Sequence, residues 1–163
     1  MALPTGILSS CTMCVELTTN GTDWIDFSSW LTVLEPGAVT RDTAEESTFG
    51  EDVMATAVGH RNPIEVTLRS VYTDLTTATG TGANPFAYIW TQWTTNCGGA
   101  LAVRWSPAGC TTGSQVFSTA TNTGHYSRLI SQTPPAGNAG DAAVLTWEAV
   151  VRAPELSWAT WAA

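Results

Sequence analysis

The chain contains no lysine, and charged residues of any kind are scarce. Charged side chains make up 12% of the 163 residues, about half the share that is usual in globular proteins. All six basic residues are arginines, and the 14 acidic residues give a formal net charge of −8. A chain with so little positive charge has no basic patch for phosphate groups, which excludes ordinary nucleic-acid binding.

Long apolar runs and enzyme signatures are also missing. No apolar run approaches the ~20 residues that span a bilayer, so we expect no membrane binding. The amino terminus lacks Lys and Arg and has Pro4 inside its apolar stretch, unlike a secretory signal. His60 and His125 have no partner motif, and there is no G-x-S-x-G, H-E-x-x-H or P-loop. We therefore expect no enzymatic activity and no cofactor.

The four cysteines form two local pairs, Cys11-x2-Cys14 and Cys97-x12-Cys110. A four-thiolate zinc site is typically built from two C-x2-C motifs, and the first pair is not answered by a second one. No histidine lies beside either pair. We therefore expect no metal, whereas two disulfides and four buried thiols both remain compatible with these spacings.

Small and polar residues take the place of the missing charges, with 27 Thr, 21 Ala, 14 Gly and 12 Ser. The chain reads as short strands separated by polar turns. Residues 14–18 alternate apolar and polar side chains, as a half-buried strand does. Asn20-Gly21 predicts a turn. The longest strand is expected at residues 64–73, with one face formed by Ile64, Val66, Leu68, Ser70 and Tyr72.

One helix is expected at residues 85–96. Asn84 suits the N-cap and Pro85 suits the first helical position, while Gly98-Gly99 ends the helix. The helix carries an apolar stripe at i, i+3, i+4 and i+7, which we expect to dock on the sheet. The stripe consists of Phe86, Ile89, Trp90 and Trp93.

Further strands are expected at residues 24–27, 30–34, 53–58, 101–105, 115–119, 126–131 and 143–152, and residues 132–141 as a loop. These elements predict a mainly β (α+β) fold, a β-sandwich or barrel of about eight strands with one flanking helix. Residues 36–52 are expected to form a long early loop that holds six of the twenty charged residues. Both a solvated excursion and a contact role fit a loop of this kind.

The carboxy-terminal part of the chain indicates burial by a neighbouring subunit. The strand at residues 143–152 has two partly apolar faces, because Val144 and Val150 lie opposite the main apolar face. Beyond Pro154 the tail carries Trp158 and Trp161, whose burial would remove about 150–250 Å² each from water. We expect these indoles to dock on this subunit or on another.

The order of the elements is specific. Thr22-Asp23-Trp24-Ile25-Asp26 precedes a strand that ends at Val33-Leu34-Glu35-Pro36, and a charged loop closes with Glu46-Ser47-Thr48-Phe49-Gly50-Glu51-Asp52. Gly59-His60-Arg61-Asn62-Pro63 leads into the long strand, and the helix and the strand Val103-Arg104-Trp105-Ser106-Pro107-Ala108-Gly109 follow. A late strand ends before Ala153-Pro154-Glu155. Over about residues 15 to 157, this order resembles the tail tube (major tail) proteins of long-tailed bacteriophages.

The resemblance implies a virion protein, made in the host cytoplasm, that self-assembles into stacked hexameric rings. The rings would form the tail tube, with other tail proteins as partners and DNA as a non-adhering cargo. It also implies a domain at residues 14–157 between an N-terminal arm, 1–13, and a C-terminal tail, 158–163. The implied contact residues with neighbouring subunits are Arg41, Asp42, Glu45, Glu46, Glu51, Asp52, Trp158 and Trp161.

Two other functions fit parts of the same pattern. Another virion β-sandwich, such as a head decoration or tail-terminator protein, would form trimers or a single capped ring. A secreted carbohydrate-binding module is suggested by the eight tryptophans and the paired cysteines. Against it, no secretory signal is evident and most of the tryptophans fall on core-phase positions.

Overall fold

The computed structural model describes residues 13–46, 55–73, 84–95, 99–120, 127–136 and 144–161. These ranges contain eleven strands and a single helix, which confirms the mainly β fold class. The helix α1 has 11 residues, and no helix in the described ranges is long and apolar enough to cross a membrane. The elements are β1 (Cys14–Thr18), β2 (Ile25–Asp26), β3 (Leu31–Pro36), β4 (Arg41–Glu46), β5 (Ala55–Arg61), β6 (Ile64–Val71), α1 (Pro85–Thr95), β7 (Ala102–Ser106), β8 (Gln115–Ser118), β9 (Arg128–Ala136), β10 (Thr146–Ala153) and β11 (Ser157–Thr160).

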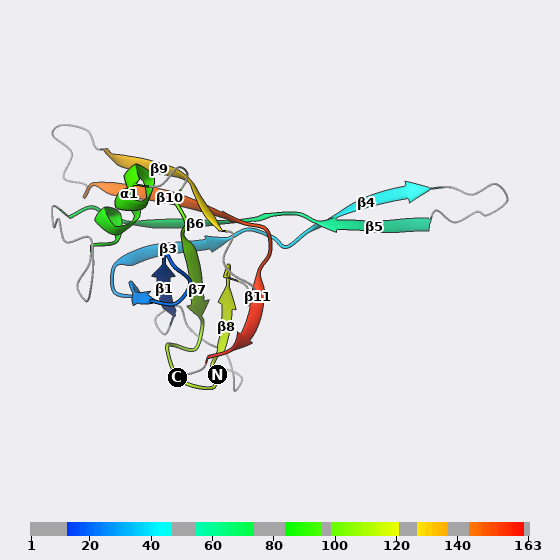
Figure 1. Ribbon diagram of the computed structural model, residues 1–163, viewed down its shortest axis with the longest axis horizontal. Helices are drawn as coiled ribbons and strands as arrows, with labels where there is room; N and C mark the ends of the chain where they lie inside the picture. The colour runs from blue at the N-terminus through cyan, green and yellow to red at the C-terminus, as the bar shows by residue number, and fades with distance from the viewer. Residues whose placement is uncertain are drawn as a thin grey trace, which may run out of the picture.

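The strands form three antiparallel sheets (Figure 1). A five-stranded sheet has the order β11-β8-β7-β1-β2, and a four-stranded sheet has the order β3-β6-β10-β9. Strands β4 and β5 pair only with each other in the described residues and extend away from the rest of the molecule as a long hairpin. Neither of the larger sheets closes into a barrel within the described ranges.

The two larger sheets share one hydrophobic core. The four-stranded sheet contributes Val66 and Leu68 of β6 and Trp147 of β10, while the five-stranded sheet contributes Leu17 and Val103. Each of these side chains is at most 1% exposed. The alternation predicted for residues 64–70 is confirmed, because the pattern of buried and accessible residues along β6 follows the period of two.

The Asn-Gly turn and the helix start are confirmed as predicted. Gly21 has a φ of +81°, which a residue without Cβ adopts without strain. Asn20 Oδ1 accepts hydrogen bonds from the backbone N–H groups of Thr22 and Asp23. Asn84 Oδ1 accepts from Phe86 N at 2.9 Å, and the buried Asn84 amide donates to Thr73 Oγ1 at 2.7 Å. The cap residue therefore also joins the segment that follows β6 to the start of α1.

The helix docks through part of the predicted stripe and through one residue outside it. Ile89 is fully buried, and Phe86 lies edge-on to Tyr72 and Trp147 with ring centroids 5.2 and 5.8 Å apart. Tyr88, which the stripe omits, is also buried against Phe27.

Three stretches differ from the sequence-based expectation. The charged segment expected as an irregular loop contains the regular strand β4, which pairs with β5. The segment from Gln132 to Ala136, expected as loop, belongs to β9 despite Pro134 and Pro135. This is tolerated because β9 lies at the edge of its sheet, where an N–H can be lost. Ser157–Thr160, beyond the last expected strand, forms β11.

Removing the Tyr88 hydroxyl is expected to change how stability depends on alkaline pH. Burial raises the pKa of Tyr88 above its ordinary value of 10.0, and hydrogen bonds with Thr19 offset part of this increase. Above about pH 10 the unfolded chain releases the Tyr88 proton while the folded protein still holds it. The free energy of unfolding is therefore unaffected by Tyr88 ionisation below about pH 10 and decreases as the pH rises further. Denaturant unfolding of Tyr88→Phe should show a shallower alkaline loss than that of the unsubstituted protein. Equal slopes above about pH 10 would contradict this assignment.

Candidate assembly surfaces

The hairpin of β4 and β5, here called the ribbon, prolongs the four-stranded sheet beyond its core. Strands β3 and β6 pair with each other, and β4 and β5 continue the same two chain segments outward. Hydrogen bonds at its base join Gly37 N to Glu65 O at 2.7 Å and Asn62 N to Thr40 O at 2.9 Å. Pro63 has no N–H to donate at this junction. Backbone hydrogen bonds therefore continue almost without interruption from the β3–β6 pair to the β4–β5 pair.

The described side chains of the ribbon are all exposed, from Thr40 to Ala44 and from Val58 to Arg61. Val58 is 63% exposed and pairs with Thr43, and Val39 at the ribbon base is 62% exposed. A two-stranded hairpin is at best marginally stable alone in water, and these valines contribute nothing to the core. Within the described part of the chain, the ribbon thus presents exposed apolar side chains and strand edges without a sheet partner.

Of the residues predicted to contact neighbouring subunits, Arg41 and Asp42 lie on this ribbon. The Arg41 guanidinium reaches the Gly59 carbonyl oxygen at 3.5 Å, and the Asp42 Cβ faces Gly59 so closely that a Cβ there would lie 3.2 Å away. Glu45 and Glu46 belong to β4, while Glu51 and Asp52 lie outside the described residues. The sequence-based contact set did not include the exposed Val39 and Val58. An apolar residue in a predicted strand is normally expected to be buried, and its exposure becomes evident only when the neighbouring strands are known.

The carboxy-terminal tryptophans lie in different environments. Strand β11 pairs with β8, and on it Trp158 is 64% exposed. Trp161 is 8% exposed, and its backbone N–H donates to Ser114 O at 2.6 Å. The part of the predicted tail that the structure describes is thus an edge strand followed by a buried indole.

Arg104 holds this end of the chain in place. Its guanidinium carbon lies 4.3 Å from the ring centroids of both Trp24 and Trp161, and it forms a short ion pair with Glu16. The Glu16 side chain is only 12% exposed. Each ring attracts the cation, and the carboxylate neutralises it. The Arg104 side chain therefore joins β1, the segment around Trp24 and the carboxy-terminal end of the chain.

The remaining arginines are also engaged. On the outer face of the four-stranded sheet, Arg69 Nη2 lies 2.6 Å from Glu148 Oε2, and this contact raises the pKa of Arg69 above its ordinary value. Arg152 and Arg61 form longer pairs with Glu65 and Glu155, at 4.0 and 3.4 Å. With Arg104, four of the six arginines have carboxylate partners. Arg41 and Arg128 donate to backbone carbonyl oxygens.

Helix α1 exposes two of the four residues predicted to dock it. Trp90 is 37% exposed and Trp93 is 44% exposed, although Trp90 stacks on Phe86 with ring centroids 5.6 Å apart. The helix is therefore anchored by Phe86, Tyr88 and Ile89, and the two indoles lie toward its solvent side.

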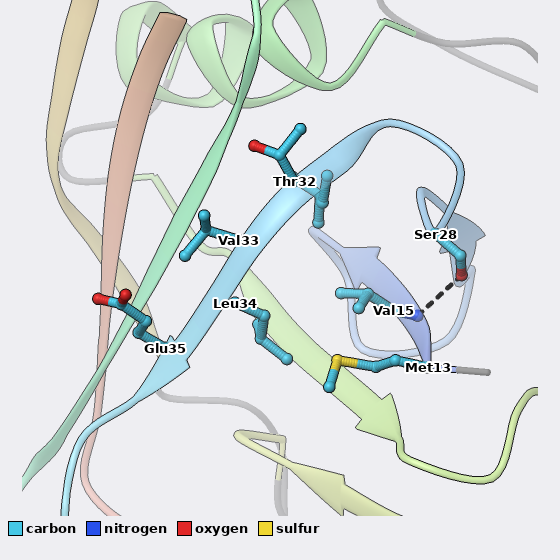
Figure 2. A pocket seen from close by; sticks show the side chains of 8 residues that line it. Met13, Val15, Ser28, Thr32, Val33, Leu34 and Glu35 are labelled. Carbon is cyan, nitrogen blue, oxygen red and sulfur yellow. Dashed lines mark hydrogen bonds between the residues drawn. The ribbon is translucent and has the colours of Figure 1, made fainter. Parts of the chain in front are cut away.

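A groove of about 310 Å³ opens between β3 and the start of β1 (Figure 2). Its lining residues are Met13, Val15, Ser28, Leu31, Thr32, Val33, Leu34 and Glu35. Glu35 is the sole ionisable side chain among them, so the groove holds no acid and base pair of the kind that proton-transfer catalysis requires.

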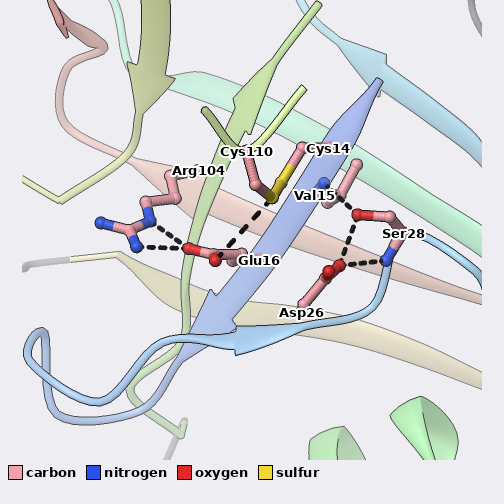
Figure 3. A network of polar contacts seen from close by, with 7 residues as sticks. All are labelled: Cys14, Val15, Glu16, Asp26, Ser28, Arg104 and Cys110. Carbon is pink, nitrogen blue, oxygen red and sulfur yellow. Dashed lines mark hydrogen bonds and ion pairs between the residues drawn. A yellow bond between two sulfur atoms is a disulfide. The ribbon is translucent and has the colours of Figure 1, made fainter. Parts of the chain in front are cut away.

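The structure joins one cysteine from each of the two local pairs. Cys14 of β1 forms a disulfide with Cys110, which follows β7, and their Cα atoms are 5.3 Å apart (Figure 3). Antiparallel pairing of β1 and β7, with Cys14 opposite Ser106, brings the two cysteines together across 96 residues of sequence. The local pairs of the sequence are thus not the bonded ones, and Cys11 and Cys97 lie outside the described residues.

Comparisons with family models and with curated protein sequences give no match. Solved structures do share the fold. A chain of the anti-feeding prophage cap (AFP tube terminating cap) has a TM-score of 0.68 at 14% identity, covering 98% of this chain and 95% of that chain. A chain of an extracellular contractile injection system, the PVC sheath-tube complex in the extended state, has a TM-score of 0.65 at 14% identity, with 96% and 94% covered.

A chain from the virion of the native gene transfer agent particle has a TM-score of 0.61 at 9% identity, covering 96% of this chain and all of that chain. At such identities the likeness concerns the fold alone. The resemblance to tail tube proteins that the sequence predicts is confirmed at that level, since this chain has the fold found in components of tail-like injection systems and phage-like particles.

Replacing Arg104 is expected to weaken the attachment of the carboxy-terminal strand. Arg104→Lys keeps the charge but loses the planar group that lies between Trp24 and Trp161, so we expect a loss of about 1–2 kcal/mol in the free energy of unfolding. The matched control Arg152→Lys changes an exposed pair and should cost less than ~0.5 kcal/mol. Equal losses in denaturant unfolding of the two variants would show that the stacking contributes nothing.

Proposed function

We propose that this chain is a structural tail protein that self-assembles into stacked hexameric rings and so forms the tube of a phage-like tail. The observation that carries the proposal is the ribbon, which combines exposed apolar side chains with strand edges that have no partner among the described residues, in a chain of tail-tube fold. Such a hairpin gains stability when its surface is covered by another subunit. In a stack of rings, the covering surface belongs to the adjacent ring.

The four-stranded sheet supports ring closure. Its outer strands in the described residues are β3 and β9, which are different segments, and the outer edge of β9 is bonded to residues 99–101 only at its start. Pairing of β3 in one copy with β9 in the next is a heterologous contact, and repeated heterologous contacts close into a ring when the rotation allows it. Arg128 and Leu129 already bond to residues 99–101, and Pro134 and Pro135 lack N–H groups, so this pairing would use the part of β9 between them, Ile130 to Thr133.

The charge distribution supports a conduit through which DNA passes without adhering. Affinity for the DNA backbone comes mainly from Lys and Arg that release counterions from phosphates. This chain has no lysine, and four of its six arginines are already paired with carboxylates. Few cations therefore remain free to hold a passing nucleic acid.

A second candidate function is that of a tube terminator or cap. The similarity to the AFP tube terminating cap favours it. A terminator stops at a single ring, because one of its faces does not accept another copy. The number of copies and rings in the assembled state therefore separates the two candidates, and native mass spectrometry with negative-stain electron microscopy measures both.

Purified protein is expected to form rings and tubes in negative-stain images, and Val58→Asp is expected to abolish the tubes. A buried carboxylate in the inter-ring contact would be desolvated without a partner, whereas in the free subunit Val58 is exposed and the melting temperature should not change. Val58→Thr keeps the branched shape and serves as the control. Strict monomers of the unsubstituted protein at high concentration would refute the proposal, and Val58→Asp tubes would exclude the ribbon from the contact.

Assembly is expected to be easier at high salt. Six copies at −8 each give a ring a formal charge of −48, and this self-repulsion opposes association until ions screen it. Light scattering should show faster tube growth at ~500 mM than at ~10 mM salt. The same rate at both concentrations would show that the acidic residues lie away from the contacts.

A further inference from the structure

Three candidate metal ligands converge beside the five-stranded sheet. The Sγ atoms of Cys14 and Cys110 and one carboxylate oxygen of Asp26 all lie within 4.8 Å of one another. They come from β1, from β2 and from the segment after β7 (Figure 3). We propose that reduction of the Cys14–Cys110 disulfide converts this place into a three-ligand site for a soft divalent cation such as Zn²⁺.

The donor spacing suits a tetrahedral ion. Zinc binds thiolate sulfur at about 2.3 Å and carboxylate oxygen at about 2.0–2.2 Å, which places the donors of one shell roughly 3.5 Å apart. After reduction the two Sγ atoms, now covalently bonded, would move apart to about 4 Å. The Asp26 oxygen, which lies no more than 4.8 Å from either sulfur, would approach by about 1 Å. The fourth position is left for water, and Glu16 Oε1 lies 3.9 Å from the Cys110 Sγ.

The Asp26 carboxylate is already oriented. Ser28 donates to Asp26 Oδ1 from its backbone N at 2.8 Å and also from its hydroxyl. The Ser28 Oγ in turn accepts a hydrogen bond from Val15 N at 2.9 Å, next to Cys14 (Figure 3). Metal-binding carboxylates are typically held by such hydrogen bonds, which reduce the entropy lost when the ion binds.

The bond is accessible to a reductant and the reaction balances. Cys14 is buried, but Cys110 and Asp26 are exposed. A dithiol transfers two electrons and two protons to the disulfide and becomes a disulfide itself, leaving two free thiols. Zn²⁺ then replaces the two thiol protons, which are released, and the Asp26 carboxylate completes the protein ligands.

The ion would take over the structural task of the disulfide in a reducing compartment. The covalent bond joins β1 to the segment after β7, and the metal would join both to β2 as well. Because the ion binds the folded state, it stabilises that state by mass action. The site does not depend on the tail role, so its test is separate from the assembly experiments.

The test is an anaerobic Co²⁺ titration of the full chain carrying Cys11→Ser and Cys97→Ser, after dithiol reduction and desalting. We expect one Co²⁺ per chain, a sulfur-to-cobalt charge-transfer absorption, its loss on adding Zn²⁺, and a higher melting temperature with Zn²⁺ than with chelator. Adding Cys14→Ser or Cys110→Ser should remove the absorption. Asp26→Asn should weaken affinity about 10–100-fold.

Asp23→Asn is the matched control, a nearby exposed carboxylate outside the group, and should leave the affinity unchanged. Circular dichroism follows folding in each sample. The proposal is overturned if the reduced protein shows no charge-transfer absorption, or if Asp26→Asn and Asp23→Asn bind equally well. It is overturned equally if reduction unfolds the chain and Zn²⁺ does not restore the fold.

Discussion

The pairing of β6 with β10 is the interaction on which the rest of the molecule depends. All eight residues of β6 pair in register with β10, from Ile64 opposite Ala153 to Val71 opposite Thr146. A shift of one residue would move every buried side chain to the opposite face, so the apolar alternation fixes the register. β3 and β9 then add at the two sides, and α1 packs against Trp147 of β10.

The same register arranges the outer face and the ribbon. Arg69 lies opposite Glu148 and Arg152 opposite Glu65 because their inward neighbours are buried, which neutralises two of the six arginines in this one sheet. Since β3 and β6 continue outward as β4 and β5, the ribbon inherits its direction from the core. A body that carries a long hairpin with an exposed valine, and sheet edges that are partly unpaired in the described residues, is suited to assembly. This combination is the basis of the proposed tail role.

Much of the body could be predicted from local sequence. Strand β1 was predicted with its observed bounds, and the alternation along β6 and the Asn84 cap of α1 follow from side-chain periodicity and backbone chemistry. Strand β4 was missed because its polar sequence, RDTAEE, has no apolar face, and its order comes from pairing with β5. Strand β11 was missed because it is short and is followed by Trp161, whose position depends on residues 113–114 and on Arg104.

The sequence by itself determined the mainly β class, the helix that follows Asn84, the scarcity of cations and the resemblance to tail tube proteins, because each follows from composition or from local patterns along the chain. Only the tertiary structure decided the pairing of Cys14 with Cys110, the place of Arg104 between two indoles and the exposure of Val58. Each of these depends on contacts between residues that are distant in the chain. Such contacts are set by strand order and register, which no short stretch of sequence specifies.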